Sequence, residues 1–414
     1  MRTKERASNL RTPPGPLIHA ETEPPNGTLR TVLFAPTYPP AYLGGGPIRT
    51  LDALVREAPP GHSIRVFTSD RDLNQEQRLP VVANEWLPDH PAHVYYASVD
   101  RPLNLLMGLH AIWKTNPEVL YFNSFFNPTF SILPQVLWSA GRNKRVVKLL
   151  APRGEFSRGA LALKSVKKKA FISLYRTAGL HRRVIWHASS SGEAADIRRV
   201  WGDACTILVR ENETSLPPLA DAPSEPNSST RAVFLGRIVP KKGLAVLLRA
   251  LCQVILPIQV DIYGSDEDRR YALGCRRVAS RLPEHVKVNF LGPLPPSAVR
   301  ATLAAYDLLL MPTEGENFGH VIAEALSVSC PVMCTPDTPW TNLLQNGGGS
   351  IVPANRSEEW RVAIDKFGSL ESHQKHEARL GARAAYAHWR AQPAEPHILD
   401  LVRHAVIRRG SHAG

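Results

Sequence analysis

The segment LLLMPTEGENFGHVIAEAL, which runs from Leu308 to Leu326, decides the fold of this 414-residue chain. Its first four residues are a continuous apolar run ended by Pro312, which predicts a buried parallel strand. Between 319 and 327 the apolar residues recur at helical spacing, so a helix is expected after one short loop. A strand, a loop and a helix in this order form the repeating unit of a doubly wound α/β sheet.

Two carboxylates flank the start of that helix. Glu316 lies in the loop, and Glu324 lies eight positions later, about a turn and a half into the helix. A helix start offers unpaired amides to a phosphate, and carboxylates accept hydrogen bonds from sugar hydroxyls. The alternative is structural: Glu316 would cap the helix, and Glu324 would lie on a solvated face.

The residues TEGENFGHVIAEAL, followed by Cys-Pro-Val at 330–332, resemble the signature of retaining nucleotide-sugar glycosyltransferases of family 4. The similarity extends over most of residues 30–365. It implies an α/β chain with the GT-B fold, in which two Rossmann-like, doubly wound domains face a central cleft. It also implies that Glu316 binds hydroxyls of the donor sugar and that Glu324 binds the ribose. The other donor contacts expected in this segment are Asn317, Phe318, Gly319, His320 and Val321.

A second block, RAVFLGRIVPKKGL at 231–244, places Arg237 and Lys242 at a strand-to-helix turn. An Arg fork and a Lys point charge can neutralise a diphosphate without a metal. The resemblance implies that these two residues act on the leaving diphosphate, which makes Arg237, Lys242 and Glu316 the expected catalytic set and predicts no metal and no cofactor. Lys241 is expected to be a solvated neighbour.

A third block contains three glycines at 44–46, after an expected strand at 31–35 and before an expected helix at 47–57. Glycines before a helix also serve simple tight turns. The family has a Gly-Gly loop here that faces the donor diphosphate, which implies contacts from Gly45 and Gly46, aided by Arg49. Gly264 follows the expected strand at 259–263 and by the same resemblance lies near the base.

The acceptor side is expected around the segment LAPRGEFS at 150–157. Many family members have a His here that touches the donor sugar, and this chain has none. Arg153 and Glu155, with Asn123 after a neighbouring strand, are the candidates to replace it. A strained turn with a surface Arg–Glu pair is an equal alternative. Trp340 either stacks on a sugar or fills the core, and core is favoured.

The alternation of strand and helix predicts two domains. The expected boundaries are a flexible N-terminal extension at 1–27, an acceptor-side domain at 28–210, a linker at 211–230, a nucleotide-sugar-binding domain at 231–378, and a C-terminal helical segment and tail at 379–414. Besides those named above, strands are expected at 63–68, 119–122, 145–150 and 184–188, and at 232–235, 287–290, 308–311 and 331–334. No run of 18 apolar residues occurs, so no membrane span is expected.

The chain is basic, with a formal net charge of +13 and a pI near 9.7. Lysines, arginines and apolar residues interleave at 164–183, which fits an anionic membrane surface. For any single lysine in this stretch a solvated helix face is the more frequent explanation. Nucleic acid would satisfy the same charges but is not expected. The five cysteines are irregularly spaced and are interpreted as reduced thiols. Because many members of the resembling family act on lipid-linked acceptors at the inner membrane surface, the resemblance implies a cytoplasmic location, peripheral to the inner membrane face.

The resemblance therefore implies a retaining glycosyltransferase that moves a hexosyl or N-acetylhexosaminyl group from a nucleoside-diphosphate sugar to a hydroxyl of a lipid-linked or saccharide acceptor, in cell-surface polysaccharide or glycolipid biosynthesis. Two alternatives remain: a GT-B epimerase or phosphorylase, and a non-catalytic protein that binds membrane or nucleic acid. Asp-x-Asp strings at Asp70/Asp72 and Asp266/Asp268 would suit a metal-dependent GT-A transferase, a less favoured alternative.

Overall fold

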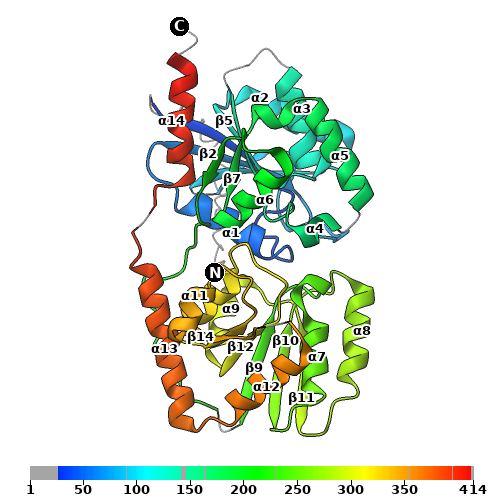
Figure 1. Ribbon diagram of the computed structural model, residues 1–414. Helices are drawn as coiled ribbons and strands as arrows, with labels where there is room; N and C mark the ends of the chain where they lie inside the picture. Colours follow the sequence, from blue (N-terminus) through cyan, green and yellow to red (C-terminus); the bar gives the residue numbers. More distant parts are fainter. Residues whose placement is uncertain are drawn as a thin grey trace, which may run out of the picture.

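The protein forms two α/β domains stacked end to end (Figure 1). The computed structural model describes residues 27–89, 91–140, 146–162, 165–227, 229–353, 355–393 and 395–411. The expected N-terminal extension, except for Gly27, and Lys164 of the basic stretch lie outside the described residues.

The N-terminal domain is built on an eight-stranded sheet with the order β3-β4-β2-β1-β5-β6-β7-β8. Its strands are β1 (Leu29–Phe34), β2 (His62–Ser69), β3 (Trp86–Asp89), β4 (Ala92–Ala97), β5 (Val119–Asn123), β6 (Val147–Ala151), β7 (Ile185–Ala188) and β8 (Ile207–Val209). Neighbouring strands are parallel except β3, which runs antiparallel to β4. Because β1 pairs with both β2 and β5, the strand order reverses at β1, which is where a doubly wound sheet opens a crevice at its carboxyl edge.

Each of the five strands expected in this half is present within a few residues, although residue 145 at the start of one lies outside the described residues. Strands β3, β4 and β8 were not expected. Strands β3 and β8 have only 4 and 3 residues, too few to display a period. Strand β4 is buried at five of its six positions, so it lacks the alternation that marks a half-exposed strand.

Helices cover both faces of this sheet. Helices α1 (Gly46–Arg56) and α14 (Ile398–Ser411) pack on one face. The other face carries α2 (Pro102–Lys114), η1 (Pro128–Ile132), α3 (Leu133–Ala140), α5 (Ser165–Thr177), η2 (Leu180–Arg183) and α6 (Ser191–Trp201), with the short α4 (Arg158–Ala162) nearby. The core on that side is aromatic, since the Phe125 ring lies within about 6 Å of those of Phe156, Tyr175 and Trp186.

The C-terminal domain contains a six-stranded, all-parallel sheet with the order β11-β10-β9-β12-β13-β14. Its strands are β9 (Thr230–Leu235), β10 (Ile258–Tyr263), β11 (Val286–Gly292), β12 (Leu308–Met311), β13 (Val332–Cys334) and β14 (Gly349–Ile351). One face carries α7 (Leu244–Leu251), preceded by η3 (Pro240–Lys242), together with α8 (Arg269–Ala279) and α12 (Ser357–Gly368). The other carries α9 (Pro296–Ala304), α10 (His320–Leu326), α11 (Thr341–Leu343), η4 (Leu344–Gly348) and α13 (Ser372–Arg390).

All five strands expected in this half are present. Strand β14 was not expected, because its sequence follows a run of glycines that predicts a loop. Gly349 fits there for a packing reason: a Cβ at this position would lie 1.9 Å from the carbonyl oxygen of Val332 on β13. The neighbouring strand therefore demands glycine, and this requirement is not local in sequence.

The chain crosses between the domains twice. After β8 it passes into the C-terminal domain, and after α13 it returns, so that α14 lies against the N-terminal domain (Figure 1). The expected end of the second domain at residue 378 falls inside α13, which continues to Arg390.

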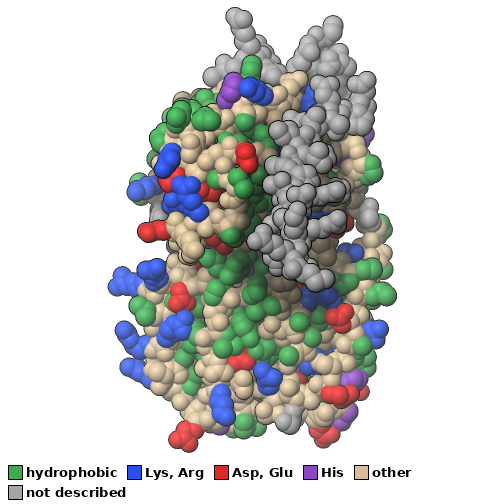
Figure 2. All heavy atoms as spheres, turned by 180° about the vertical axis from the view of Figure 1, so that it is seen from behind, with side chains coloured by type: hydrophobic (Ala, Val, Ile, Leu, Met, Phe, Trp, Pro, Cys, Tyr) green, Lys and Arg blue, Asp and Glu red, His purple; other side chains and the backbone are tan. Residues whose placement is uncertain are grey.

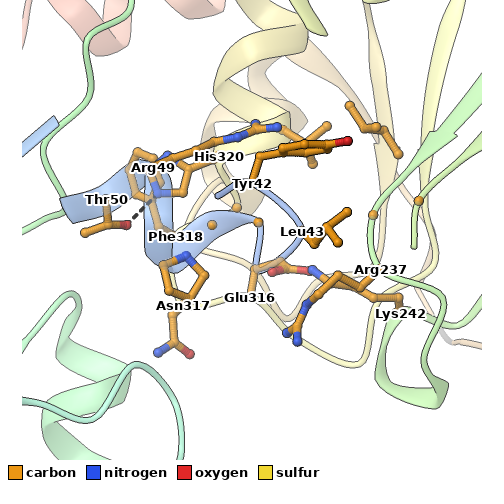
Figure 3. A pocket seen from close by; sticks show the side chains of 18 of the residues that line it. Tyr42, Leu43, Arg49, Thr50, Arg237, Lys242, Glu316, Asn317, Phe318 and His320 are labelled. Carbon is orange, nitrogen blue, oxygen red and sulfur yellow. Dashed lines mark hydrogen bonds and ion pairs between the residues drawn. The ribbon is translucent and has the colours of Figure 1, made fainter. Parts of the chain in front are cut away.

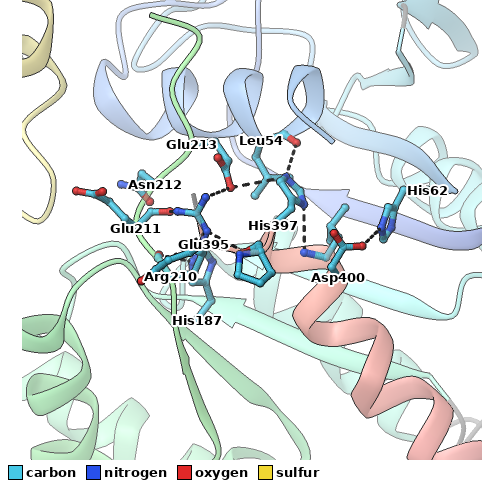
Figure 4. Close-up of polar contacts among 12 residues, drawn as sticks. Leu54, His62, His187, Arg210, Glu211, Asn212, Glu213, Glu395, His397 and Asp400 are labelled. Atoms are coloured by element: carbon cyan, nitrogen blue, oxygen red, sulfur yellow. Dashed lines mark hydrogen bonds and ion pairs between the residues drawn. The ribbon is translucent and has the colours of Figure 1, made fainter. Parts of the chain in front are cut away.

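Arg210 ties the two crossings together (Figure 4). Its guanidinium donates to the carbonyl of Pro396 at 3.0 Å and pairs with Glu213 at 2.9 Å. His397 then donates from Nε2 to the carbonyl of Leu54 at the end of α1 (3.1 Å). The returning segment is thus bonded to the linker and to the N-terminal domain.

Within the described residues, no helix has the length and apolar character needed to cross a membrane. All five cysteines are free; Cys334 is buried as the last residue of β13, and Cys330 is buried just before that strand. Burial raises the pKa of both thiols to about 12, which suits core packing better than ligation.

Candidate active site

A pocket with about 1190 Å³ of empty space, including the part open to solvent, lies between the two domains (Figure 3). It is bounded by loops that follow β1, β9, β10 and β12, at the carboxyl edges of both sheets. Twelve of the fifteen predicted site residues line it: Gly45, Gly46, Arg153, Arg237, Lys242, Gly264, Glu316, Asn317, Phe318, Gly319, His320 and Val321. The sequence motifs, which lie far apart in the chain, therefore converge on one site.

Lys242 and Glu316 form an ion pair on the pocket floor, with Nζ 2.6 Å from Oε1. Their side chains are 17% and 12% exposed, so water screens the pair only in part. Burial by itself would raise the pKa of Glu316, but the charge and hydrogen bond of Lys242 outweigh it and lower that pKa below its ordinary value. Glu316 is thus held as a carboxylate, an acceptor for hydroxyl donors.

Two further cationic side chains, Arg237 and Lys241, lie at the same end of the pocket as Lys242. Arg237 pairs with Glu267 at 2.6 Å and keeps 37% of its side chain exposed. Lys241, expected to be solvated, instead lines the pocket, because Pro240, Lys241 and Lys242 form the single turn η3 that holds both lysines against the site. Burial lowers the pKa of Lys241, and none of the described residues pairs with its ammonium. This end of the pocket therefore suits a polyanion.

The second carboxylate of the motif is bonded across the cleft. Glu324 accepts two short hydrogen bonds from Nη1 of Arg49, which comes from α1 of the other domain. Burial raises the pKa of Glu324, and Arg49 opposes that rise. Glu324 does not line the pocket itself, and Arg49 stands between it and the open space.

His320 also bridges the domains. Its Nε2 lies 2.7 Å from Oγ1 of Thr50 on α1 (Figure 3). Burial and the nearby cations Arg49 and Arg153 lower the pKa of His320 to about 3, so the ring is neutral at neutral pH. Together with Arg49–Glu324, this contact holds the start of α1 against the start of α10.

Glycine is favoured at two predicted positions for different reasons, a close backbone approach at Gly264 and a positive φ at Gly45. Gly264 lies directly against the turn after β9, where a Cβ would come within 1.9 Å of the carbonyl oxygen of Gly236. Gly45 has a φ of 67° and precedes the first turn of α1, a left-handed conformation that favours glycine.

Arg153 and Glu155, predicted together, point to different places. Arg153 lines the pocket, and its guanidinium donates to Asn123 Oδ1 (2.7 Å), the Tyr121 hydroxyl (2.7 Å) and Asn212 Oδ1. Glu155 turns into the N-terminal domain, where Ser124 Oγ (2.7 Å) and two backbone amides donate to it. Glu155 is therefore a loop-stabilising residue and not a pocket residue.

The alternative for this segment was a strained turn with a surface Arg–Glu pair, and only its first half agrees with the structure. The turn is strained, with φ of 51° at Arg153 and 78° at Gly154, but no Arg–Glu surface pair forms. Asn123, which is 5% exposed, does not line the pocket and contributes by holding Arg153.

Trp340 belongs to the core, as favoured. It is 3% exposed, packs edge-on against Phe318, and donates from Nε1 to the carbonyl of Phe318. It supports the loop of Phe318 from behind.

The Asp-x-Asp strings have structural partners. Asp72 accepts hydrogen bonds from the amides of Tyr42 and Leu43, and Asp268 caps α8. Within the described residues, no cluster of three or more His, Cys, Asp or Glu side chains could hold a metal.

Several pocket residues were not predicted: Tyr42, Leu43, Thr50, Asn212, Pro293 and Leu294. Tyr42 and Leu43 belong to the loop that Asp72 fixes from 30 residues away, so no local pattern marks them. Asn212 lies in the expected linker, where its polar character looked ordinary. Thr50 could have been predicted, because it lies one turn into a helix that was expected to begin at the site.

Comparison with known proteins agrees with this geometry. Two facing α/β domains with the site between them define the GT-B class, and solved structures share it. A sucrose-phosphate synthase from Thermosynechococcus elongatus superposes with a TM-score of 0.69 at 16% identity, covering 93% of this chain and 100% of that one. HepE of Anabaena in complex with UDP-glucose gives 0.62 at 16% identity, with 93% and 100% covered.

Residues 220–385 match the family described as glycosyl transferases group 1. A phosphatidyl-myo-inositol mannosyltransferase of Mycobacterium leprae is 31% identical over 186 residues, which are 42% of this chain and 48% of the relative. A D-inositol 3-phosphate glycosyltransferase of Rhodococcus erythropolis is 32% identical over 162 residues, 37% of this chain and 35% of the relative. The chain thus aligns with half or less of these curated relatives.

Proposed function

We propose that this protein is a retaining glycosyltransferase that moves a hexosyl or N-acetylhexosaminyl group from a nucleoside-diphosphate sugar to a hydroxyl acceptor in glycolipid or cell-surface polysaccharide biosynthesis. The observation that carries the proposal is the Lys242–Glu316 pair on the floor of the interdomain pocket, with Arg237 and Lys241 beside it. It joins cations for a diphosphate to an acceptor for sugar hydroxyls in one place.

In this mechanism the donor diphosphate lies against Arg237, Lys241 and Lys242, while Glu316 orients the sugar through its hydroxyls. The bond between the anomeric carbon and the diphosphate oxygen breaks, and the acceptor oxygen bonds to the same face of that carbon. The acceptor proton passes to the departing diphosphate. The side chains supply position and charge stabilisation, and the cations act without a metal.

Glu324 would bind the ribose. In the unliganded protein Arg49 occupies its carboxylate, so ribose hydroxyls must share or displace that contact. The affinity for a nucleotide therefore includes the free energy of rearranging Arg49. A UDP-sugar is a reasonable first donor, since HepE was crystallised with UDP-glucose.

The acceptor is proposed to be lipid-linked or a saccharide, in line with the names of the curated relatives. Basic side chains are spread over both domains (Figure 2). In the stretch 164–183, Phe171, Ile172 and Tyr175 pack into the core, which leaves Val166 and Leu174 exposed among Lys167, Lys169, Arg176, Arg182 and Arg183.

The same face of the sheet presents more apolar surface on α2, where Leu103, Leu106, Met107 and Trp113 are each more than half exposed. Exposed apolar side chains and a basic helix on one face of a domain fit the interface of an anionic bilayer. We therefore place the protein in the cytoplasm, with this face of the N-terminal domain on the inner membrane.

A thermal-shift screen against UDP-, GDP- and ADP-sugars tests the donor half. Binding only to the folded state raises the melting temperature, by an amount set by concentration and affinity. The proposal requires one sugar nucleotide to stabilise the protein and to yield a product with a new glycosidic bond. A product altered only within the sugar nucleotide would favour an epimerase, and no response to any donor would favour a binding protein.

Vesicle sedimentation tests the membrane half. Vesicles that contain phosphatidylglycerol should retain the protein, and phosphatidylcholine vesicles should not. Changing Leu103 and Leu106 to Ser should weaken retention while leaving the donor-induced thermal shift unchanged. Equal retention on both vesicle types would contradict this placement.

A further inference from the structure

The charges that line the interdomain pocket do not balance. The cationic side chains on its wall are Arg49, Arg153, Arg237, Lys241 and Lys242, and Glu316 is the acidic one. Arg49 is paired with Glu324, Arg237 with Glu267, and Lys242 with Glu316. Among the described residues, Arg153 and Lys241 form no salt bridge.

Lys241 is explained by the proposed function. It belongs to the same turn as Lys242 and lies beside Arg237, where the diphosphate would bind. Arg153 comes from the opposite domain, in the turn after β6, and approaches His320, whose pKa it helps to lower. A donor diphosphate therefore leaves the charge of Arg153 without a counterpart.

All three hydrogen-bond partners of Arg153 are neutral: two amide oxygens and a hydroxyl. The Tyr121 hydroxyl in turn donates to His187 Nδ1 (2.8 Å), whose Nε2 donates to the carbonyl of Arg210 (3.0 Å), so this chain of bonds contains no acid. Glu193 lies near the turn, but its carboxylate accepts from the amide of Gly154 (2.6 Å) and from Ser189. It does not pair with Arg153.

The Arg153 guanidinium keeps N–H donors available for a ligand. Arg has five N–H donors, and three are used here, which leaves one on each terminal nitrogen. The left-handed backbone at Arg153 and its three bonds fix the side chain in place. Strain of this kind is typical of residues positioned for binding.

Asn317 gives a second, independent indication that a ligand binds beside Arg153. Its side-chain amide lies against Gly154, where a Cβ would come within 2.7 Å of Nδ2. Its Nδ2 is buried and has no hydrogen-bond partner. A buried donor without an acceptor is costly, and a ligand oxygen at this end of the pocket would satisfy it.

We infer that the pocket takes a second anionic group besides the donor diphosphate: a phosphate or carboxylate carried by the acceptor, bound by Arg153 with Asn317 beside it. This inference rests on the proposed function and names its acceptor class. Guanidinium groups bind both oxyanions through paired hydrogen bonds, so the two sources share one chemistry.

Isothermal titration calorimetry with matched probes tests the inference. The protein is first saturated with the nucleoside diphosphate that gives the largest thermal shift. It is then titrated with inositol 1-phosphate against inositol, and with glucuronate against glucose. We expect one anionic probe to bind at least tenfold more tightly than its neutral counterpart, and the pair that responds identifies the group as phosphate or carboxylate.

Variants of Arg153 and Lys241 test which side chain produces the preference for the anionic probe. Arg153→Gln should abolish the preference for the anionic probe, whereas Arg153→Lys, which keeps the charge but loses the fork, should retain much of it. Lys241→Gln should weaken nucleotide binding and leave the preference intact. Melting temperatures of all variants report their folding.

The outcomes separate this inference from the function on which it depends. If no nucleotide binds, the proposed function fails. If a nucleotide binds but charged and neutral probes bind equally, the anionic acceptor is overturned. Loss of the preference to the same extent in Arg153→Lys and Arg153→Gln would also overturn it, because the role of Arg153 would then be structural.

Discussion

At the scale of single residues, the proposed chemistry depends most directly on the Lys242–Glu316 pair. The two side chains lie 74 positions apart in the chain and meet at 2.6 Å on the pocket floor. The charge and hydrogen bond of Lys242 lower the pKa of Glu316, so the loss of Lys242 also changes its partner. The motif predicted that both residues belong to the site, but their direct contact emerged only in the structure.

We expect Lys242→Ala to lower sugar transfer by about 10²- to 10³-fold, because a preorganised charge aimed at the leaving group is lost. Glu316→Ala should have a similar effect through loss of sugar positioning. Steady-state transfer with the donor found by thermal shift measures both. Lys287→Ala, on an exposed position of β11, is the control and should transfer normally. Near-normal turnover in either site variant would contradict the assignment.

His320 makes stability depend on pH. Its folded pKa of about 3 lies below the ordinary value of 6.5, and that of buried His187 is also about 3. Between pH 3 and pH 6.5 the two histidines bind more protons in the unfolded state than in the folded state. The free energy of unfolding therefore decreases as the pH falls below 6.5. Each histidine contributes up to about 1.4 kcal/mol per pH unit.

Urea unfolding between pH 4.5 and 7 measures this slope. His320→Gln keeps a donor near Thr50 but removes the titration, so it should reduce the slope by the contribution of one histidine. His373→Gln is the control, since that side chain is 66% exposed. An unchanged slope in His320→Gln would show that His320 titrates normally in the folded protein.

At the scale of elements, the strand-to-helix turns determine where the site lies. Gly243 links η3 to α7 with a φ of 70°, and a Cβ there would lie 1.7 Å from the carbonyl oxygen of Pro312 after β12. This close approach brings the Lys242 turn against the Glu316 loop. The sequence predicted a turn here, but not the neighbour that excludes a side chain.

We therefore expect Gly243→Ala to destabilise the protein by about 1–3 kcal/mol or more through backbone strain, and to impair donor binding as well. Gly274→Ala provides a matched control, because Gly274 is exposed within α8 and a Cβ there meets nothing within 4 Å. That substitution should be neutral or stabilising by about 0.5–1 kcal/mol. Denaturant unfolding compares the two, and equal effects would contradict the packing argument.

At the scale of the whole molecule, α14 makes the N-terminal domain depend on the end of the chain. Ile398, Leu399 and Val402 are buried in the same core cluster as residues of β1, β2, β6 and α1. The sequence predicted a helical segment near the C-terminus, but its partner could not be predicted. An amphipathic helix shows which of its faces is buried and not which surface covers it.

We expect Leu399→Ala to reduce the free energy of unfolding by about 2–5 kcal/mol, because Leu399 is fully buried. Hydrogen exchange should locate the loss in the N-terminal domain, around α1 and β1. Leu380→Ala on α13, where 44% of the residue is exposed, is the control and should cost far less. Protection lost only in the C-terminal domain would contradict the packing of α14.

The sequence by itself determined the fold class, most strands, and the residues of the donor motifs, because each of these depends on local periods and on spacings within one strand-loop-helix unit. The tertiary structure decided what those residues contact. Arg49 reaches Glu324 across 275 positions and Thr50 reaches His320 across 270, while Glu155 turns away from the pocket that Arg153 lines. Such pairings depend on how two domains meet, and a pattern confined to a short stretch of chain carries no record of the surface that faces it.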